Sequence, residues 1–326
     1  MSDAAETPVP VTVLTGFLGC GKTTLLRRIL GGDHGRRIAV IENEFGEIGI
    51  DRELVFDAEE EIFVANNGCL CCTVRGDLIR ILDRLMARRH DFDHILIETT
   101  GLADPGPVAQ TFFADERIAA RLRLDGIVTL VDALHLERQL DESEATRSQV
   151  AFADVLLLNK IDLVGAESLE RVEGLLRRIN TTAPLYRTRQ AAVGLDRILD
   201  LGAFELDRAL ELDPHFLAAD EGHHHHLRDI GSVGLSMTGA VDPERFEVWL
   251  TTLLMELGPA VFRMKGVLHL EGEDRRYVFQ GVYMHFDCEA ADDWGRRERL
   301  NQLVFIGRGL DRREFVEGFK SCLTQG

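Results

Sequence analysis

The chain lacks any long hydrophobic run. Nowhere do its apolar residues extend over the roughly 20 positions that a membrane-spanning helix requires. The first ten residues, MSDAAETPVP, are polar and acidic, so they also lack the basic and apolar regions of a signal peptide. Positive charge is scarce, because 37 Lys and Arg stand against 55 Asp and Glu, which gives a net charge of −18. We therefore expect a cytoplasmic protein whose main partner is neither nucleic acid nor an anionic membrane.

Cysteine is sparse, and its distribution is uneven. Three of the six cysteines fall within Cys69–Cys72, and the others are Cys20, Cys288 and Cys322. Cytosolic thiols stay reduced, so this cluster indicates metal or redox chemistry rather than structural disulfides. We expect Cys288 and Cys322 to be solitary core or surface thiols.

The first part of the chain predicts an α/β fold. Short apolar runs alternate with helical patterns, as in a doubly wound and mostly parallel sheet. The expected strands are Val11–Thr15, Arg37–Ile41, Glu61–Ala65, His94–Glu98, Asp125–Val131, Asp154–Leu158 and Pro184–Tyr186. The expected helices include Val74–Arg89 and Glu167–Asn180.

The pattern changes near residue 200, and 326 residues suffice for two domains. We predict a first domain over residues 1–205, an acidic, histidine-rich linker over 206–226, and a smaller α+β domain over 227–326. Asp242-Pro243-Glu244 predicts a helix start, with a capping residue, a proline at the first helical position and an acid in the first turn. The strands expected here are Leu227–Met237, Val261–Leu270, Tyr277–Phe286 and Gln302–Gly307, and a last helix follows Asp311.

A glycine-rich stretch between the first strand and a helix fits the pattern G-x-x-x-x-G-K-[ST]. Its glycines let backbone N–H groups face phosphate oxygens, and the helix N-terminus adds partial positive charge. We expect Lys22 to reach the β- and γ-phosphates and the Thr23 hydroxyl to bind Mg²⁺. A structural strand–helix turn is the alternative. The residues expected to bind nucleotide here are Gly16, Gly19, Cys20, Gly21, Lys22, Thr23 and Thr24.

The tetrapeptide Asn159-Lys160-Ile161-Asp162 places N-K-x-D at a strand end, at the sheet edge where ligands bind. Asp162 can accept hydrogen bonds from both N–H groups of the Watson–Crick edge of guanine, which adenine does not offer. The stem of Lys160 can lie over the ring. We therefore expect GTP rather than ATP, with Asn159, Lys160 and Asp162 at the base.

A second strand end carries Glu98-Thr99-Thr100-Gly101. A carboxylate at Glu98 can hold Mg²⁺ or its water, and the N–H of Gly101 can meet the γ-phosphate. A strand-end acid facing water is the alternative. No glutamine follows Gly101 in the next three residues, so we expect slow intrinsic GTP hydrolysis. The expected catalytic residues are Lys22, Thr23, Glu98 and Gly101.

The C-x-C-C motif at Cys69, Cys71 and Cys72 cannot close a tetrahedral site in the manner of two C-x₂-C pairs. It offers two or three thiolates and leaves room for another ligand, which suits transfer of a soft or borderline metal ion. A redox pair and small packing residues are the alternatives. The tract His223-His224-His225-His226 is a second metal-prone segment, and a solvated linker without function is its alternative.

Taken together, these motifs resemble those of the CobW-type GTPases, which are metallochaperone-like proteins. The resemblance rests on GFLGCGKTT, ENEFGE, GCLCC, ETTGLADPGP, NKID and the C-terminal RMKG, FQGV and LVFIGRGLD, and it covers nearly the whole chain. It implies a GTPase domain, a CobW C-terminal domain and metal at Cys69, Cys71 and Cys72, with Glu42 and Glu47 as candidate acidic co-ligands. We expect Cys20 to be a small filler facing the loop interior. Because most family members have alanine where it stands, an additional metal contact is the alternative for this thiol.

Our leading hypothesis is a GTP-dependent metallochaperone. It would use GTP and Mg²⁺ to carry Zn²⁺, with Co²⁺ and Ni²⁺ as alternatives, to a client apo-protein. A metal-storage protein with incidental GTPase activity and a cobalt-insertion subunit for corrin synthesis are the other hypotheses. The oligomeric state stays open, with a homodimer among the alternatives.

Overall fold

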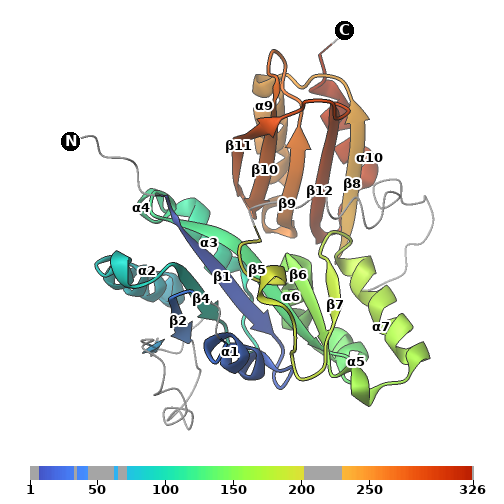
Figure 1. Ribbon diagram of the computed structural model, residues 1–326. Helices are drawn as coiled ribbons and strands as arrows, with labels where there is room; N and C mark the ends of the chain where they lie inside the picture. Colours follow the sequence, from blue (N-terminus) through green and yellow to red (C-terminus); the bar gives the residue numbers. More distant parts are fainter. Residues whose placement is uncertain (1–6, 33–34, 43–61, 65–71, 202–229, 325–326) are drawn as a thin grey trace. The chain divides into compact units, whose positions relative to one another are not determined.

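The computed structural model describes residues 7–32, 35–42, 62–64, 72–201 and 230–324. The chain divides into two compact units, Met1–Glu173 with Pro184–Ala203, and Gly174–Ala183 with Phe204–Gly326. Each unit holds one of the two sheets that the structure describes (Figure 1). The predicted linker over 206–226 lies outside the described residues, so the predicted domain limits stay predictions.

The first unit contains a seven-stranded parallel sheet with the strand order β3-β2-β4-β1-β5-β6-β7. Its strands are β1 (Val9–Gly16), β2 (Ile38–Glu42), β3 (Ile62–Val64), β4 (His94–Glu98), β5 (Leu122–Asp132), β6 (Val155–Asn159) and β7 (Leu185–Arg187). The chain runs from β1 outward to β2 and β3, returns through β4, and continues on the other side of β1 with β5, β6 and β7. This order confirms the doubly wound α/β sheet, and it places β1 where a ligand site is expected.

Helices and short 3₁₀ segments connect these strands (Figure 1). The α-helices are α1 (Lys22–Leu30), α2 (Cys72–Met86), α3 (Gly106–Ala114), α4 (Glu116–Ala119), α5 (Leu136–Glu142), α6 (Glu144–Phe152) and α7 (Ala166–Ile179). The 3₁₀ segments are η2 (Arg89–Asp91), η3 (Ile161–Leu163) and η4 (Leu195–Arg197).

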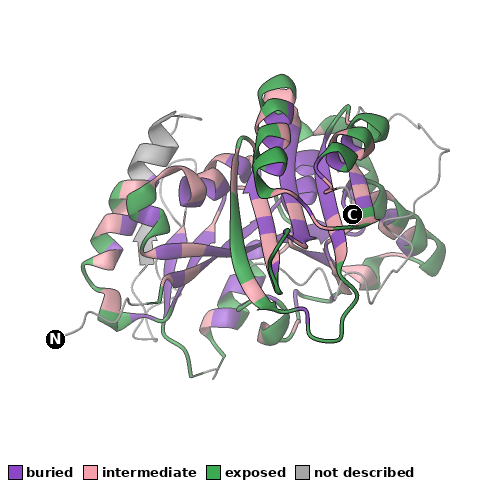
Figure 2. Ribbon diagram, turned by 90° about the horizontal axis from the view of Figure 1, so that it is seen from above, coloured by how far each residue is buried: buried purple, intermediate pink, exposed green. Residues whose placement is uncertain are grey.

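The sheet is buried on both faces, as its continuous apolar strands predict. All residues of β6 are buried, including Leu156 and Leu157, and neighbouring side chains of a strand point to opposite faces of the sheet. Figure 2 colours the chain by burial and shows buried residues along the strands. On one face, Leu25 and Ile29 of α1 pack in a core cluster with Leu14 of β1. This packing fixes α1, and with it the start of the glycine-rich loop.

The second unit contains a five-stranded antiparallel sheet with the order β11-β10-β9-β12-β8. Its elements are β8 (Ile230–Thr238), α9 (Pro243–Leu257), η6 (Gly258–Ala260), β9 (Val261–Leu268), β10 (Arg275–Val282), β11 (His285–Asp293), β12 (Leu300–Arg308) and α10 (Arg312–Ser321). Asp242 caps α9 as predicted, because its side chain accepts hydrogen bonds from the N–H groups of Glu244 and Arg245. The ring of Phe246 meets Phe279 edge-on at 5.6 Å, which joins α9 to β10.

The predicted strand Tyr277–Phe286 corresponds to β10 up to Val282, but its predicted end at Phe286 is wrong. The structure has a hairpin here, in which β10 ends at Val282, β11 starts at His285, and these two residues pair. Tyr283 takes the positive φ of 53° that the two-residue turn requires, although Gly, Asn or Asp is usual at such a position. β11 is an exposed edge strand with the acidic sequence HFDCEAADD, so it has no hydrophobic alternation to reveal it.

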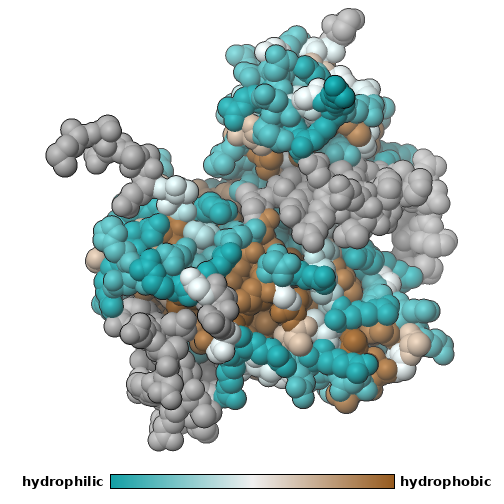
Figure 3. All heavy atoms as spheres, in the orientation of Figure 1, coloured by the Kyte–Doolittle hydropathy of each residue, from teal (hydrophilic) through white to brown (hydrophobic). Residues whose placement is uncertain are grey.

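Figure 3 shows mostly hydrophilic residues on the visible face of the second unit, whereas hydrophobic residues gather over part of the first. Among the described residues, no helix has the length and hydrophobicity needed to cross a bilayer.

Candidate functional site

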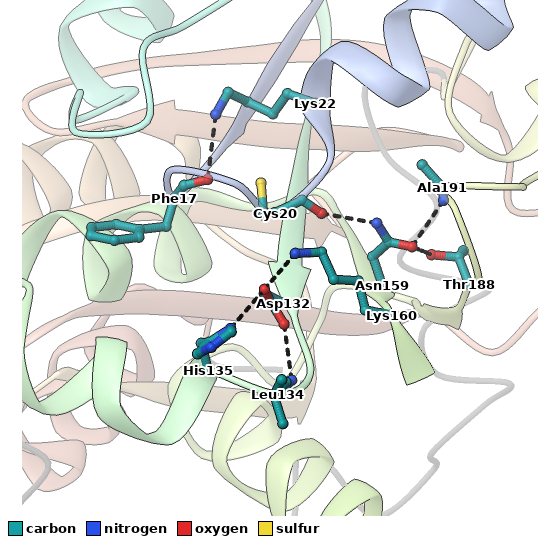
Figure 4. Close-up of polar contacts among 10 residues, drawn as sticks. All are labelled: Phe17, Cys20, Lys22, Asp132, Leu134, His135, Asn159, Lys160, Thr188 and Ala191. Carbon is teal, nitrogen blue, oxygen red and sulfur yellow. Dashed lines mark hydrogen bonds and ion pairs between the residues drawn. The ribbon is translucent and has the colours of Figure 1, made fainter. Parts of the chain in front are cut away.

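The glycine-rich loop connects the end of β1 to the start of α1 and has a wound backbone. Gly16, Gly19 and Gly21 take φ values of 137°, 75° and 114°, which L side chains rarely adopt. A side chain at Gly16 would also collide with the carbonyl oxygen of Leu130. Lys22 Nζ donates hydrogen bonds to the carbonyl oxygens of Gly16 (2.7 Å) and Phe17 (3.5 Å), so its ammonium lies over the loop (Figure 4). Thr23 and Thr24 are exposed in the first turn of α1.

Cys20 packs into the core of the first unit. Its side chain is fully buried, in the same cluster as Leu14 and Leu25. Burial raises the pKa of the thiol to about 11, so it is protonated at neutral pH, whereas metal ligands are thiolates. The geometry therefore favours a packing role for this side chain over the additional metal contact considered above.

Asn159, at the end of β6, ties three segments together (Figure 4). Its Nδ2 donates to the carbonyl oxygen of Cys20 at 2.9 Å. Its Oδ1 accepts from Thr188 Oγ1 at 3.1 Å and from the N–H of Ala191 at 2.8 Å. A Cβ at Gly21 would lie 2.5 Å from Asn159 Nδ2, so this contact also requires the glycine. The N-K-x-D motif is thereby held at a fixed place beside the glycine-rich loop.

Lys160 is held by a buried carboxylate that the sequence motifs did not indicate. Lys160 has a left-handed backbone (φ 62°), and its Nζ lies 2.8 Å from Oδ2 of Asp132 at the end of β5. Asp132 also accepts from the N–H of Leu134 at 3.0 Å, and Nδ1 of His135 lies 3.0 Å from its Oδ2 (Figure 4). Burial raises the pKa of Asp132, but the hydrogen bonds from Lys160, His135 and Leu134 outweigh it and lower this pKa. Asp162, by contrast, is exposed in η3.

The Glu98–Gly101 segment lies against the glycine-rich loop. β4 runs beside β1, where Glu98 pairs with Leu14, and Thr99 Oγ1 donates to Thr15 Oγ1 at 2.8 Å. A Cβ at Gly101 would lie 2.7 Å from the backbone nitrogen of Leu18, so only glycine fits here. The structure thus brings Gly101 and the loop together, as expected for two parts of one phosphate site.

The expected metal ligands are only partly described. Glu42 ends β2 and pairs with Val64 of β3 on one side and with Glu98 on the other. Cys72 is the first residue of α2. Cys69, Cys71, Glu47 and His223–His226 lie outside the described residues. Within the described part of the chain, no group of three or more His, Cys, Asp and Glu side chains could hold a metal ion.

Comparison with known proteins identifies the family. Residues 10–187 match the nucleotide-binding domain of CobW/HypB/UreG, and residues 230–323 match the C-terminal domain of the cobalamin synthesis protein CobW. The chain belongs to the CobW family. Its two matched regions correspond to the two sheets, and the resemblance stated from the motifs is confirmed.

CobW relatives match over almost the whole chain. The zinc chaperone YjiA of Escherichia coli is 38% identical over 96% of this chain and 98% of its own length. The zinc-regulated GTPase metalloprotein activator 1 of Schizosaccharomyces pombe is 35% identical over 97% of this chain and 86% of its own. The crystal structure of the Zn(II)-bound YjiA GTPase from E. coli matches with a TM-score of 0.74 and 34% identity, over 98% of this chain and all of the other.

Proposed function

We propose that this protein is a GTP-dependent zinc chaperone that hydrolyses GTP slowly and transfers Zn²⁺ to client proteins. The observation that carries the nucleotide part is the 2.9 Å hydrogen bond from Asn159 Nδ2 to the carbonyl oxygen of Cys20. It fixes the N-K-x-D residues relative to the phosphate loop, as one ligand with a base and a triphosphate requires. The names of the relatives support zinc as the cargo.

Base recognition falls to Asp162 and Lys160. The exposed carboxylate of Asp162 accepts hydrogen bonds from the two N–H groups on the Watson–Crick edge of guanine. Asp132 anchors the ammonium of Lys160, so the stem of Lys160 forms a rigid platform for the ring. The hydrogen bonds between Asp162 and guanine explain a preference for GTP over ATP.

Phosphate binding uses the loop, Lys22 and the Glu98–Gly101 segment. The N–H groups of the loop surround phosphate oxygens. When nucleotide binds, the Lys22 ammonium leaves the loop carbonyl oxygens that it contacts here and binds the β- and γ-phosphates instead. The Thr23 hydroxyl and the Glu98 carboxylate are the oxygen ligands that Mg²⁺ prefers, so they fit the ion that neutralises developing phosphate charge. The N–H of Gly101 meets the γ-phosphate, while Leu102, Ala103 and Asp104 supply no glutamine to orient water, so turnover is slow.

The cargo site is built from the C-x-C-C motif. Cys72 starts α2, where the partial positive charge of a helix N-terminus stabilises a thiolate. Cys69 and Cys71 follow β3, whose last residue, Val64, pairs with Glu42. The pairing supports Glu42 as an oxygen co-ligand, and Glu47 is the second candidate. His223–His226 act as a low-affinity collecting site for the same metal.

Nucleotide state and metal binding are coupled through the segments between them. GTP with Mg²⁺ would favour the arrangement of residues 98–101 in which the cysteine site binds the metal ion, and hydrolysis would release the ion. Residues 230–323 match the C-terminal domain of a cobalamin synthesis protein, so cobalt delivery is the second candidate function.

The test is metal competition on protein loaded with a slowly hydrolysed GTP analogue. We expect wild type to prefer Zn²⁺ to Co²⁺ and the variant Cys71→Ser to lose at least tenfold in Zn²⁺ affinity, because one thiolate ligand is gone. Cys288→Ser, which changes an exposed thiol on β11, is the matched control and should bind Zn²⁺ like wild type. Tight Zn²⁺ binding by Cys71→Ser would refute the assignment of the cargo site, and a preference for Co²⁺ would favour the second function.

A further inference from the structure

Helix α6 buries four consecutive polar residues, from Thr146 to Gln149. Arg147, Ser148 and Gln149 are 6%, 7% and 1% exposed, although a helix packed on a sheet normally turns apolar residues inward. Buried polar side chains are unfavourable unless they make hydrogen bonds, so their partners indicate what they stabilise. Two of these residues, Ser148 and Gln149, make hydrogen bonds to the segment from Gly101 to Asp104.

Gln149 holds the backbone of this segment. Its Nε2 donates to the carbonyl oxygen of Gly101 at 3.2 Å and to that of Ala103 at 3.0 Å. Beside it, Ser148 Oγ donates to Asp104 Oδ1 at 2.9 Å. Gly101 therefore contacts Gln149 through its carbonyl and lies against Leu18 of the phosphate loop through its Cα. Gln149 therefore helps to set the orientation of Gly101.

Two buried polar atoms at this place lack a hydrogen-bond partner among the residues that the structure describes. They are Oε1 of Gln149 and Oγ1 of Thr100. An unsatisfied buried polar atom costs free energy, so an arrangement that satisfies both would be favoured. The two atoms are complementary, because the amide oxygen accepts and the threonine hydroxyl donates.

We propose that Gln149 is the positioning residue through which the 98–104 segment distinguishes a nucleoside triphosphate from a diphosphate. This proposal rests on the GTPase function proposed above. When a γ-phosphate draws the N–H of Gly101 toward it, the segment shifts and the Thr100 hydroxyl donates to Gln149 Oε1. The triphosphate state thereby gains a hydrogen bond that the diphosphate state lacks. Gln149 itself touches no phosphate.

The test compares affinities for GDP and for a slowly hydrolysed GTP analogue in the full-length protein with Mg²⁺. Gln149→Met keeps a long side chain and removes both the donor and the acceptor. We expect its affinity for the analogue to fall about tenfold, its GDP affinity to stay within twofold of wild type, and its single-turnover hydrolysis to slow by at least tenfold. Gln139→Met, a buried glutamine on the neighbouring helix α5, is the matched control and should leave both affinities unchanged.

Thr100→Val is the second variant, because it removes the hydroxyl with little change in shape. It should reproduce the selective loss of analogue affinity, and the double variant should lose no more than Gln149→Met alone. If the ratio of analogue to GDP affinity stays within twofold of wild type in Thr100→Val, or in a folded Gln149→Met, the proposal is refuted. If wild type itself binds neither guanine nucleotide, the proposed function fails instead.

Discussion

Asp132 is a buried carboxylate that holds a residue of the N-K-x-D motif in place. It is 2% exposed, yet it keeps a lowered pKa, because hydrogen bonds from Lys160, His135 and the Leu134 N–H outweigh the effect of burial. Its negative charge holds the ammonium of Lys160, and that contact sets the position of the lysine stem. The nucleobase platform that we propose for Lys160 therefore depends on a residue outside the N-K-x-D motif.

We predict that Asp132→Asn weakens GDP binding about tenfold, which corresponds to about 1.4 kcal/mol. The reason is that the ion pair with Lys160 is replaced by a weaker hydrogen bond to a neutral amide, which loosens the hold on the lysine stem. Titration with a fluorescent GDP measures the effect. Asp141→Asn, at an exposed position on α5, is the control. Equal GDP affinity in Asp132→Asn and wild type would show that the contact has no role in binding.

We predict that Gly101→Ala slows single-turnover GTP hydrolysis by at least tenfold, while GDP binding changes little. The added Cβ would lie 2.7 Å from the Leu18 nitrogen, so the segment must move away from the phosphate loop. Gly165→Ala is the control, because a Cβ there meets nothing within 4 Å. Normal hydrolysis in Gly101→Ala would argue against a γ-phosphate contact at this position.

At the scale of the elements, three adjacent strands of the first unit share a buried polar contact. His94 Nε2 on β4 lies 2.8 Å from Thr12 Oγ1 on β1, which donates to Asp125 Oδ2 on β5 at 3.1 Å. Burial lowers the pKa of His94; Asp125 and Asp200 raise it, and Arg36 and Arg123 lower it further. The folded protein therefore keeps this ring neutral at a pH where the unfolded chain binds a proton.

We predict that this histidine makes the free energy of unfolding fall in mild acid. Above the unfolded pKa, about 6.5, both states are neutral and the stability is fully present. As the pH falls from there through the lowered folded pKa, the unfolded state binds the proton first and stability is lost. Denaturant midpoints from pH 8 to 5.5 should fall more steeply for wild type than for His94→Gln. Identical slopes would contradict the assignment.

We predict that Gly318→Ala destabilises the second unit by about 1–3 kcal/mol through overpacking. Gly318 lies on α10, and a Cβ there would collide with Nε1 of Trp249 on α9. Gly174→Ala on α7 meets nothing within 4 Å and should stabilise by about 0.5–1 kcal/mol, because alanine favours helices. The thermal unfolding midpoints of the two variants, compared with that of wild type, check both predictions. A stabilising Gly318→Ala would mean that the two helices have room to separate.

These elements show where sequence patterns suffice. His94–Glu98 was predicted with its true limits, because a strand buried on both faces is an unbroken apolar run. The cap at Asp242 was predicted, because capping is a local interaction. β11 was missed, because an exposed edge strand needs no apolar side chains and its turn lacks glycine.

The residues of the candidate site also fall into those that sequence patterns reveal and those that they do not. The phosphate loop and N-K-x-D were found because neighbouring residues in the chain form each motif. Asp132, Thr188 and Gln149 gave no such signal, because only the fold brings them to Lys160, Asn159 and Gly101. An acid at the end of a strand was the one available sign of Asp132.

At the scale of the whole molecule, we propose that the nucleotide state controls the affinity for the metal ion. The first unit supplies both the phosphate contacts and the acids Glu42 and Glu98, which pair on neighbouring strands. A γ-phosphate that repositions the segment after Glu98 therefore acts one strand away from Glu42. In the sequence, the cysteine motif comes after the next strand, β3, and its last residue, Cys72, is the first residue of α2.

The most direct test is the Zn²⁺ affinity of one preparation in two nucleotide states, measured by competition with a chelator of known affinity. We predict at least tenfold tighter Zn²⁺ binding with a slowly hydrolysed GTP analogue and Mg²⁺ than with GDP and Mg²⁺, which is a coupling of about 1.4 kcal/mol. Equal Zn²⁺ affinities in the two states would contradict the proposed coupling.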